Sequence, residues 1–326
     1  MRWILWLAAL PLAAQPTLYI CASAAKEYVV GAKLPPSGLF RNVGAAGWEH
    51  LGFNVPFLFS LDYDGGDPSV LYLAAGNGLI RASDHGRKWT LLTGSDVTEL
   101  RDVAVDRKQP GTIYFGYSHG IRVTHDGGAT WQEIGGTLHR KFTEAIRVDR
   151  AASGTLLMGG EEGVFRSENG GATWRLAGAA GWQVMHLEQS PHEACLWMAT
   201  TQGGGVFVSR DCGKTFESGG NVGVGRTLYD VAFDTAQAGR VALAGWGPGV
   251  MVSEDDGKTW QARNAGLPRT DVVSVAFDPA DAGRLYASVH EEAIYVSENA
   301  GKTWAVSGID GSSAPRMKFV PESGAK

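Results

Sequence analysis

The stretch Ser253-Glu-Asp-Asp-Gly-Lys-Thr-Trp260 decides the fold, because it recurs in register along the chain. Five further copies follow the same pattern, and a degraded seventh copy at 38–48 keeps an apolar run and a closing Trp48. The closing aromatic residues of the six good copies are 42 to 44 residues apart. We call these six segments the boxes, and they are residues 82–89, 124–131, 167–174, 209–216, 253–260 and 297–304. Repeats of roughly 20 to 50 residues are typical of solenoids and propellers.

Each box has the residues of a tight hairpin turn. We expect the Asp or Asn at its third position to accept hydrogen bonds from backbone N–H groups two residues further on. Glycine at the fifth position adopts a positive φ at little cost, and the closing ring packs against the hairpin and the next repeat. The acidic run 254–256 lacks the spacing of a calcium loop, so no metal site is predicted. The residues predicted to be structural are Asp84, Asp126, Asn169, Asp211, Asp255, Asn299, Trp89, Trp131, Trp174, Phe216, Trp260 and Trp304.

Short strands with alternating or continuous apolar character surround the boxes. In one repeat they are 102–106, 112–116, 120–124 and 130–134, and in another 230–234, 241–245, 250–253 and 259–262. Four antiparallel strands in about 40 residues form one propeller blade. The expected fold is therefore all-β, a single seven-bladed β-propeller of four-stranded antiparallel blades spanning residues 15–326.

The two ends of the chain test this interpretation. Residues 17–23 match 70–76, which is the second strand of a blade, so the first blade lacks its innermost strand. Near the other end, residues 316–320 match the inner strand 274–278. We expect the C-terminal strand to join the N-terminal blade and close the ring, which removes exposed sheet edges that would promote aggregation.

The box pattern Ser/Thr-x-Asp-x-Gly-x-Thr-Trp resembles the Asp-box of BNR-repeat propellers, and the resemblance covers essentially the whole of 15–326. The chain is similar to bacterial BNR-repeat proteins. More distantly, it resembles the photosystem II assembly-factor, sortilin-type, sialidase and xyloglucanase propellers. The first two of these distant groups imply protein binding or assembly, and the last two imply glycoside hydrolysis. A shared repeat does not transfer a partner or a reaction.

Composition and the N-terminal sequence indicate where in the cell the protein acts and which partners it does not have. The 326 residues are 44% hydrophobic with a formal net charge of −5, and no basic block is present, so a nucleic-acid partner is not expected. Arg2 and the twelve apolar residues 3–14 are typical of a secretory signal peptide, with cleavage near Ala14 preferred over a later cut at 22–24. We expect an exported monomer, periplasmic or extracellular, with no other segment able to span a membrane.

The three cysteines predict one disulfide. If Thr201 pairs with Val206 across a hairpin, Cys195 lies opposite Cys212, within bridging distance. Export would expose this pair to oxidising conditions. Cys21 is expected to be a buried free thiol. No Cys-x-x-Cys spacing is present, so neither zinc nor another cofactor is predicted.

The candidate ligand site lies on one face of the propeller. The links from each outer strand to the next inner strand, and the turns between second and third strands, gather on what we call the link face. The boxes gather on the opposite face, the box face. The link face surrounds one mouth of the central channel, and Trp182 and Trp246 are its strongest binding candidates. The full predicted set is Trp182, Trp246, Arg140, Arg226, Tyr229, His186, Arg269, His119 and His290.

Two functions remain open. The first is a non-enzymatic interaction or assembly propeller that binds a protein or glycan on the link face. The second is a glycoside hydrolase, which needs two carboxyl groups roughly 5–9.5 Å apart; the candidate residues are Glu144, Asp102 and Asp230, paired as Glu144 with Asp102 or Asp230 with Asp271. Asp102 and Asp230 have a structural alternative as caps of backbone groups, and His186 as a satisfied core residue. The Arg-Ile-Pro motif of sialidases is missing, and the length fits one propeller, whereas xyloglucanase-type enzymes use two.

Overall fold

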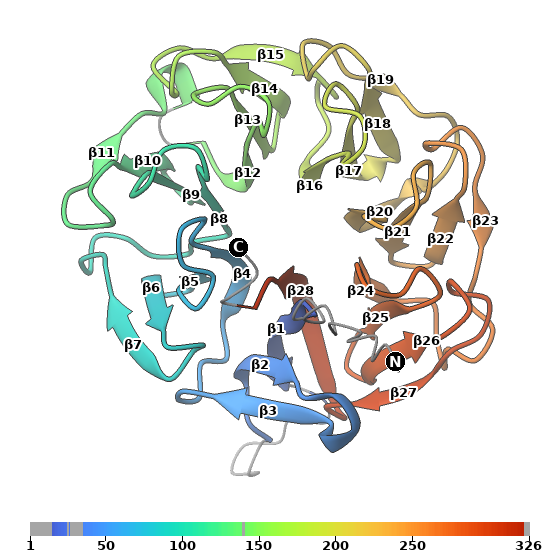
Figure 1. Cartoon of the computed structure of the whole chain (residues 1–326). Coiled ribbons are helices and arrows are strands. Elements are labelled where there is room, and N and C mark those ends of the chain that lie inside the picture. The colour runs from blue at the N-terminus through green and yellow to red at the C-terminus, as the bar shows by residue number, and fades with distance from the viewer. Residues whose placement is uncertain (1–14, 25, 27–34, 139–140, 323–326) are drawn as a thin grey trace, which may run out of the picture.

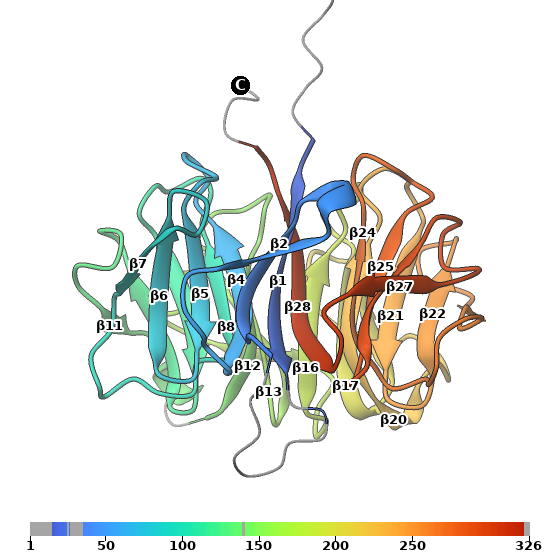
Figure 2. The same cartoon turned by 90° about the horizontal axis from the view of Figure 1, so that it is seen from below.

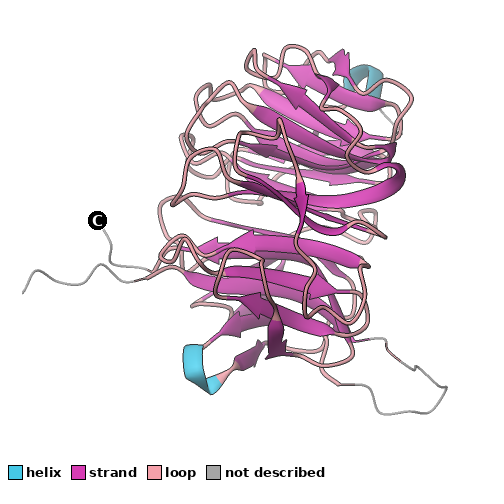
Figure 3. Ribbon diagram, turned by 90° about the vertical axis from the view of Figure 1, so that its right-hand side faces the viewer, coloured by secondary structure: helices cyan, strands magenta, loops and turns pink. Residues whose placement is uncertain are grey.

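The chain folds almost entirely into β-strands. The computed structural model describes residues 15–24, 26, 35–138 and 141–322, and the predicted signal peptide 1–14 lies outside them. In these residues the helical elements are two short 3-10 turns, η1 (Gly44–Ala46) and η2 (Gly136–Leu138). Figure 3 shows strands and connecting loops throughout the rest of the chain. None of the described helices is long and apolar enough to cross a membrane.

The strands form antiparallel sheets that stand around a central axis (Figure 1). Five sheets have four strands and one has eight. In chain order the first three sheets comprise β1 (Thr17–Ala24), β2 (Gly38–Asn42) and β3 (Trp48–Leu51); β4 (Leu58–Tyr63), β5 (Leu71–Ala75), β6 (Gly78–Ser83) and β7 (Lys88–Leu91); and β8 (Asp102–Val105), β9 (Ile113–Tyr117), β10 (Gly120–Thr124) and β11 (Gln132–Glu133).

The remaining sheets follow the same order from the axis outward. They comprise β12 (Thr143–Val148), β13 (Leu156–Gly160), β14 (Gly163–Ser167) and β15 (Arg175–Gly178); β16 (Val184–Gln189), β17 (Trp197–Gly204), β18 (Val206–Ser209) and β19 (Glu217–Ser218); β20 (Val224–Phe233), β21 (Val241–Gly245), β22 (Gly249–Ser253) and β23 (Gln261–Ala262); and β24 (Val272–Phe277), β25 (Leu285–Val289), β26 (Ala293–Ser297) and β27 (Ala305–Gly308). The last strand, β28 (Ser312–Val320), belongs to the sheet of β1.

One sheet departs from the expected four strands. Strand β20 begins six residues earlier than the predicted strand 230–234, and its first part pairs with the end of β17 through Gln202 with Thr227 and Gly204 with Val224. This pairing joins β16–β19 and β20–β23 into the eight-stranded sheet. The outermost strands β11, β19 and β23 are only two residues long, whereas β7, β15 and β27, which also follow box turns, have four residues.

The two ends of the chain lie side by side in one sheet. Strand β28 pairs with β1 in antiparallel register, with Met317 opposite Ile20 and Phe319 opposite Leu18. Figure 2 shows these strands next to each other near the axis, with both outer ends leaving on the same side. Trp48, from the degraded seventh copy, donates its indole N–H to the Ser307 carbonyl of the neighbouring sheet at 3.2 Å. Met317 is therefore packed in the fold and not free in solvent.

Five of the boxes share one hydrogen-bond pattern, except that in the two Asn boxes the side-chain amides of Asn169 and Asn299 donate to the threonine hydroxyl. In the box at 124–131, Thr124 donates its hydroxyl to Asp126 Oδ1 at 2.6 Å and accepts the N–H of Gly128 at 3.0 Å. Asp126 also accepts the N–H and the hydroxyl of Thr130 at 2.9 and 2.6 Å. We predicted that the box Asp accepts backbone N–H groups two residues further on. This was wrong, because its carboxylate reaches across the turn to Thr130, four residues after Asp126. The box at 82–89 lacks the first hydroxyl, since Ala82 stands at that position.

Two successive residues in each box have a positive φ. The fifth-position glycines have φ between 75° and 98°, and a Cβ on Gly171 would lie 2.4 Å from Ile134. The fourth position is also left-handed, even where it is not glycine, as at Cys212 and Asp256 with φ of 64° and 58°. Asp tolerates this region better than most residues. The turn thus reverses the chain tightly enough to bring the closing aromatic residue onto the preceding sheet.

The tryptophans connect neighbouring sheets. The indole N–H of Trp131 donates to the Leu92 carbonyl at 3.1 Å, and that of Trp174 to the Ile134 carbonyl at 3.1 Å. Trp304 makes the equivalent bond to the Arg263 carbonyl at 2.8 Å. Each of these acceptors lies just beyond the outermost strand of the sheet before. Buried hydrophobic clusters fill the space between adjacent sheets, so every sheet needs its neighbours to bury both faces.

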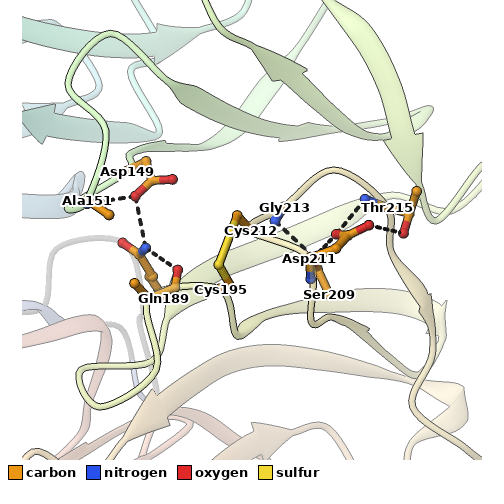
Figure 4. The surroundings of a disulfide bond; sticks show 10 residues. Asp149, Ala151, Gln189, Cys195, Ser209, Asp211, Cys212, Gly213 and Thr215 are labelled. Carbon is orange, nitrogen blue, oxygen red and sulfur yellow. Dashed lines mark hydrogen bonds between the residues drawn. A yellow bond between two sulfur atoms is a disulfide. The ribbon is translucent and has the colours of Figure 1, made fainter.

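A disulfide joins Cys195 and Cys212, and Cys21 is a buried free thiol (Figure 4). The predicted register was wrong by one residue, since Val206 pairs with Thr200, and Thr201 instead donates its N–H to the Gly205 carbonyl. Cys212 reaches Cys195 because the box turn bends it back, and its N–H donates to the Cys195 carbonyl at 3.1 Å. The bridge therefore fastens a box to the turn that precedes the second strand.

Removing this bridge should destabilise the protein. The cysteines are 17 residues apart, and a loop of that size corresponds to about 3 kcal/mol of stabilisation. We expect the double variant Cys195→Ser/Cys212→Ser to lose about that free energy of unfolding, measured by urea titration with tryptophan fluorescence. Reductant should lower the stability of the wild type and leave the double variant unchanged. Equal stability of the oxidised wild type and the variant would contradict this prediction.

Candidate functional site

The direction of the inner strands gives the channel two distinct mouths. The strands closest to the axis are β4, β8, β12, β16, β20, β24 and β28 (Figure 1). Each begins on the link face and ends on the box face, where its turn to the second strand lies beside a box. The start of β1 and the end of β28 also lie on the box face (Figure 2).

The link face displays exposed aromatic side chains from several sheets. Trp182 is 43% exposed and Trp246 is 41% exposed. Trp182 lies over the backbone of Gly203 and Gly204, and the rings of Trp246 and His290 are 5.1 Å apart. Trp246 also bridges to Asp271 through the backbone. These side chains are held by their neighbours while keeping a free ring surface.

Other predicted residues of the link face are dispersed around the ring. Arg226, Arg269 and His119 are exposed, and Tyr229 is half-buried. His119 lies on a different sheet from the tryptophans and contacts Ser118 at 2.8 Å. Arg140 lies outside the described residues. The prediction thus names residues of one face, and the structure does not bring them into a single pocket.

A second aromatic group on this face was not predicted. Phe57 is 62% exposed and stacks on Phe59. The Arg101 guanidinium lies between Phe59 and Phe142, with its carbon 4.4 and 5.3 Å from the two ring centroids. Apolar residues directly before inner strands were the available signal, but sequence alone does not separate exposed rings from buried ones at those positions.

Predicted residues His186 and Asp230 lie inside the channel and belong to a chain of charged groups on the inner strands. His186 Nδ1 and Asp230 Oδ1 are 2.6 Å apart, and Arg316 Nη1 is 3.1 Å from the same oxygen. His186 Nε2 faces the guanidinium groups of both Arg147 and Arg316. Because guanidinium groups only donate, Nε2 must carry the lone pair, and Nδ1–H donates to Asp230.

The same chain continues around the axis. Arg147 pairs with Asp102, whose carboxylate also accepts the Ser60 hydroxyl at 2.6 Å and the Ile146 N–H at 3.0 Å. Further along, Lys318 lies 2.8 Å from Asp62. Asp102, Asp62 and Asp230 each accept a backbone N–H from the inner strand of the next sheet. These carboxylates therefore fasten neighbouring inner strands to one another.

Burial and charge shift the protonation of this group. Burial raises the pKa of Asp230 to about 6, partly offset by Arg316 and by the Val275 N–H. Burial, together with the positive charges of Arg316, Arg147 and Lys318, holds the pKa of His186 well below its usual value, so the imidazole is neutral. Burial also acts to raise the pKa of Asp62, but Arg107 and Lys318 outweigh it and the pKa is lowered.

The three catalytic candidates do not converge on one site. Asp102 is fully buried, with hydrogen bonds to both of its oxygens, and Asp230 is bound within the channel as described. Glu144, at the link-face end of β12, is half-buried and accepts a hydrogen bond from Gln183 at 3.4 Å. Burial raises the pKa of Glu144, while the Arg101 charge lowers it. Asp271 lies on the link face, separate from buried Asp230.

A cavity of about 370 Å³ occupies the box-face end of the channel. His186 and Asp230 line it, whereas Trp182, Trp246, Arg226 and Arg269 do not. Its mouth is bordered by Pro16 and Pro321, close to the two ends of the described chain. Sequence reasoning directed attention to the link face and missed the lining residues Arg316 and Lys318. Their alternation along the predicted inner strand 316–320 was a usable signal, because alternate residues of such a strand face the channel.

Comparison with known proteins supports the fold and little more. No family model matches the sequence, and no curated protein does either. The structure is similar to the GH74 xyloglucanase from Xanthomonas campestris, with a TM-score of 0.62 and 18% identity over 77% of this chain. It is equally similar to YCF48 from Cyanidioschyzon merolae, with a TM-score of 0.62 and 16% identity over 85% of this chain. The chain has a β-propeller fold.

The two kinds of neighbour differ in length. The chain spans 45% of the Xanthomonas xyloglucanase and 46% of the GH74 enzyme from Niastella koreensis, but 99% of the Cyanidioschyzon YCF48 chain. A further YCF48 structure, bound to D1 peptide, matches with a TM-score of 0.61 and is covered to 94%. At these identities the likeness concerns the fold alone.

The raised pKa of Asp230 predicts a pH dependence of stability. Its folded pKa of about 6 exceeds the unfolded value of about 3.9, so its contribution to stability is complete below pH 4 and is lost as the pH rises through 6. Relative to Asp230→Asn, the wild type should lose up to about 3 kcal/mol of unfolding free energy between pH 4 and pH 6.5. Urea titrations at several pH values measure this difference. Parallel curves for the two proteins would rule it out.

Proposed function

We propose that the chain is an exported, non-catalytic binding propeller that holds a segment of a partner protein on its link face. The observation that carries this proposal is the set of exposed aromatic side chains there, Phe57, Trp182 and Trp246. They are fixed by adjacent backbone or rings, so little side-chain entropy would be lost on binding. Tryptophan is the residue type most enriched among binding hot spots.

The architecture we propose is a ring of seven blades closed by β28. The eight-stranded sheet is joined only by the short contact between β17 and β20. If it is divided there, it gives two units of four strands, β16–β19 and β20–β23, like the other five sheets. Pairing of β28 with β1 supports closure, as does the bond from Trp48 to Ser307. The hydrogen-bond pattern of the boxes supports assignment to the Asp-box repeats. Export rests on the signal sequence and is supported by the disulfide.

Neighbours of similar length favour binding. YCF48, of which this chain covers 94 to 99%, has been solved bound to D1 peptide. A nidogen/laminin complex is another structural neighbour, with a TM-score of 0.51. A single propeller of this kind presents a broad mouth on which an extended segment can lie across several blades.

One observation favours the alternative of a glycoside hydrolase. Glu144 lies at the link-face mouth with its pKa raised by burial, as a general acid requires. A hydrolase also needs a second carboxyl group facing the same space. Asp102, the nearest candidate along the neighbouring inner strand, has its carboxylate engaged by Ser60, Ile146 and Arg147 and has no exposed surface. We therefore rank binding of a protein segment above hydrolysis.

The aromatic side chains of the link face should dominate partner binding. We expect Trp182→Ala/Trp246→Ala to weaken binding about 30-fold or more, because the loss of even one hot-spot tryptophan costs about 2 kcal/mol. A partner captured from the periplasm or culture medium would be identified, purified and titrated by calorimetry. The control Leu176→Ala/Val306→Ala changes side chains that are 47% and 59% exposed on outermost strands and should bind normally. Equal binding by all three proteins would refute the assignment.

No glycoside hydrolysis is expected from the purified protein. Xyloglucan and sialylated oligosaccharides are the appropriate substrates, and reducing-sugar release is the measurement. Glu144→Gln should behave like the wild type in this assay. Hydrolysis by the wild type that disappears in Glu144→Gln would reverse the ranking of the two functions.

A further inference from the structure

The cavity on the box face is at the opposite end of the channel from the proposed partner surface. Its volume of about 370 Å³ is within the range of small-molecule sites. Part of its lining is apolar and is formed by residues near the ends of β20, β24 and β28. These residues are Val231, Ala232, Phe233, Val275, Phe277 and Phe319. An occupant must therefore have an apolar body.

The charged lining of the cavity is predominantly positive. Four cationic side chains line it, Arg147, Arg150, Arg316 and Lys318, against the carboxylates of Glu188 and Asp230. Arg147 pairs with Asp102 and, at 3.6 Å, with Glu188, and Lys318 pairs with Asp62; of these three carboxylates only that of Glu188 lines the cavity. The space consequently faces more positive than negative groups, and its polar end is suited to an anion.

Arg316 has unused hydrogen-bonding capacity. Its Nη1 contacts His186 and Asp230, while its Nε is buried without a hydrogen-bond partner among the described residues. Its side chain is 12% exposed, so most of the group is removed from water. A buried guanidinium nitrogen without an acceptor is costly; because Nε is enclosed by protein, an anion in the cavity would contact the group through a terminal nitrogen, as a charge-assisted hydrogen bond.

Arg316 and Lys318 are separated by one residue on β28, and both side chains line the cavity. The side chain of Lys318 lies 2.8 Å from Asp62 on one side of the channel, and that of Arg316 lies beside Asp230 on the other. A planar two-oxygen anion placed near them would be adjacent to the apolar side chains of β20 and β24. A carboxylate attached to an aromatic or aliphatic body matches both the cationic pair and the apolar side chains.

We propose that the box-face cavity binds an apolar carboxylic acid, either free or as the C-terminus of a peptide with an apolar last residue. Arg316 and Lys318 provide the positive groups for the carboxylate, and the ends of β20 and β24 contact the apolar body. This site is separate from the partner surface of the link face. It uses side chains at the box-face end of the channel, next to the carboxylate of Asp230 that fastens two inner strands.

Calorimetric titration with 3-phenylpropionate and with its uncharged amide tests the proposal. The acid should bind, and the amide should bind about tenfold more weakly or worse, because it lacks the charged hydrogen-bonding group. Acetyl-Ala-Phe with a free C-terminus, compared with its amidated form, distinguishes the two sources: tighter binding than phenylpropionate indicates a peptide terminus, and weaker binding indicates a free acid. No binding of either acid, or equal binding of acid and amide, would overturn the proposal.

Two variants locate the ligand. Arg316→Gln removes the guanidinium, and Ala232→Leu narrows the cavity without touching a charge; each should weaken acid binding about tenfold or more. Circular dichroism and thermal unfolding check that both variants are folded. If Arg316→Gln does not fold, Ala232→Leu alone tests whether the acid binds in this cavity. Acid binding that survives in folded Ala232→Leu would place the ligand elsewhere and refute the site. Trp182→Ala/Trp246→Ala should bind the acid normally, so loss of partner binding and loss of acid binding are distinguishable.

Discussion

The structure depends on contacts that each sheet makes with the sheet before it. The indole N–H groups of Trp131, Trp174 and Trp304 donate to carbonyl groups just beyond the previous sheet, and Trp48 does the same between the first and last sheets. The two left-handed residues in each box turn bring the closing ring back toward the preceding sheet, although Trp89 and Trp260 donate instead to the glycine carbonyl of their own box. A sheet alone would leave both faces unburied, so stability grows only as sheets accumulate around the axis.

The channel has a second set of fasteners. Asp62, Asp102 and Asp230 each accept a backbone N–H from the next inner strand and pair with a cationic side chain. Breaking one such buried pair would leave a charge without compensation. This structural use of carboxylates also limits chemistry, because an oxygen that is already bound to backbone and guanidinium groups is not available to attack a substrate or to transfer a proton.

The repeat allowed most of the fold to be predicted from the sequence. Strand positions, the pairing of the last strand with the first hairpin and the partners of the disulfide all followed from the spacing of boxes. The predicted hydrogen-bond donors to the box Asp and the predicted register of Cys195 were wrong. The first depends on the dihedral angles of the box turn, and the second on those of the glycine turn between β17 and β18, and the sequence pattern did not determine either. The extension of β20 over residues 224–229 was missed because it begins at the end of the glycine-rich stretch 219–225, which does not have a strand-like pattern.

The candidate site was harder to predict, since sequence spacing identifies a face but not a cavity. The residues expected on the link face are there in part, yet His186 and Asp230 point into the channel, and the enclosed space opens on the other face. What separates the two ends is the layer of ion pairs between them. On one side of that layer lie the exposed aromatic side chains on which we propose that a partner binds, and on the other lies a small cavity with four cationic and two acidic lining residues. The groups of this layer are the same ones that fasten neighbouring inner strands, so the separation of the two ends follows from the way the sheets are held together.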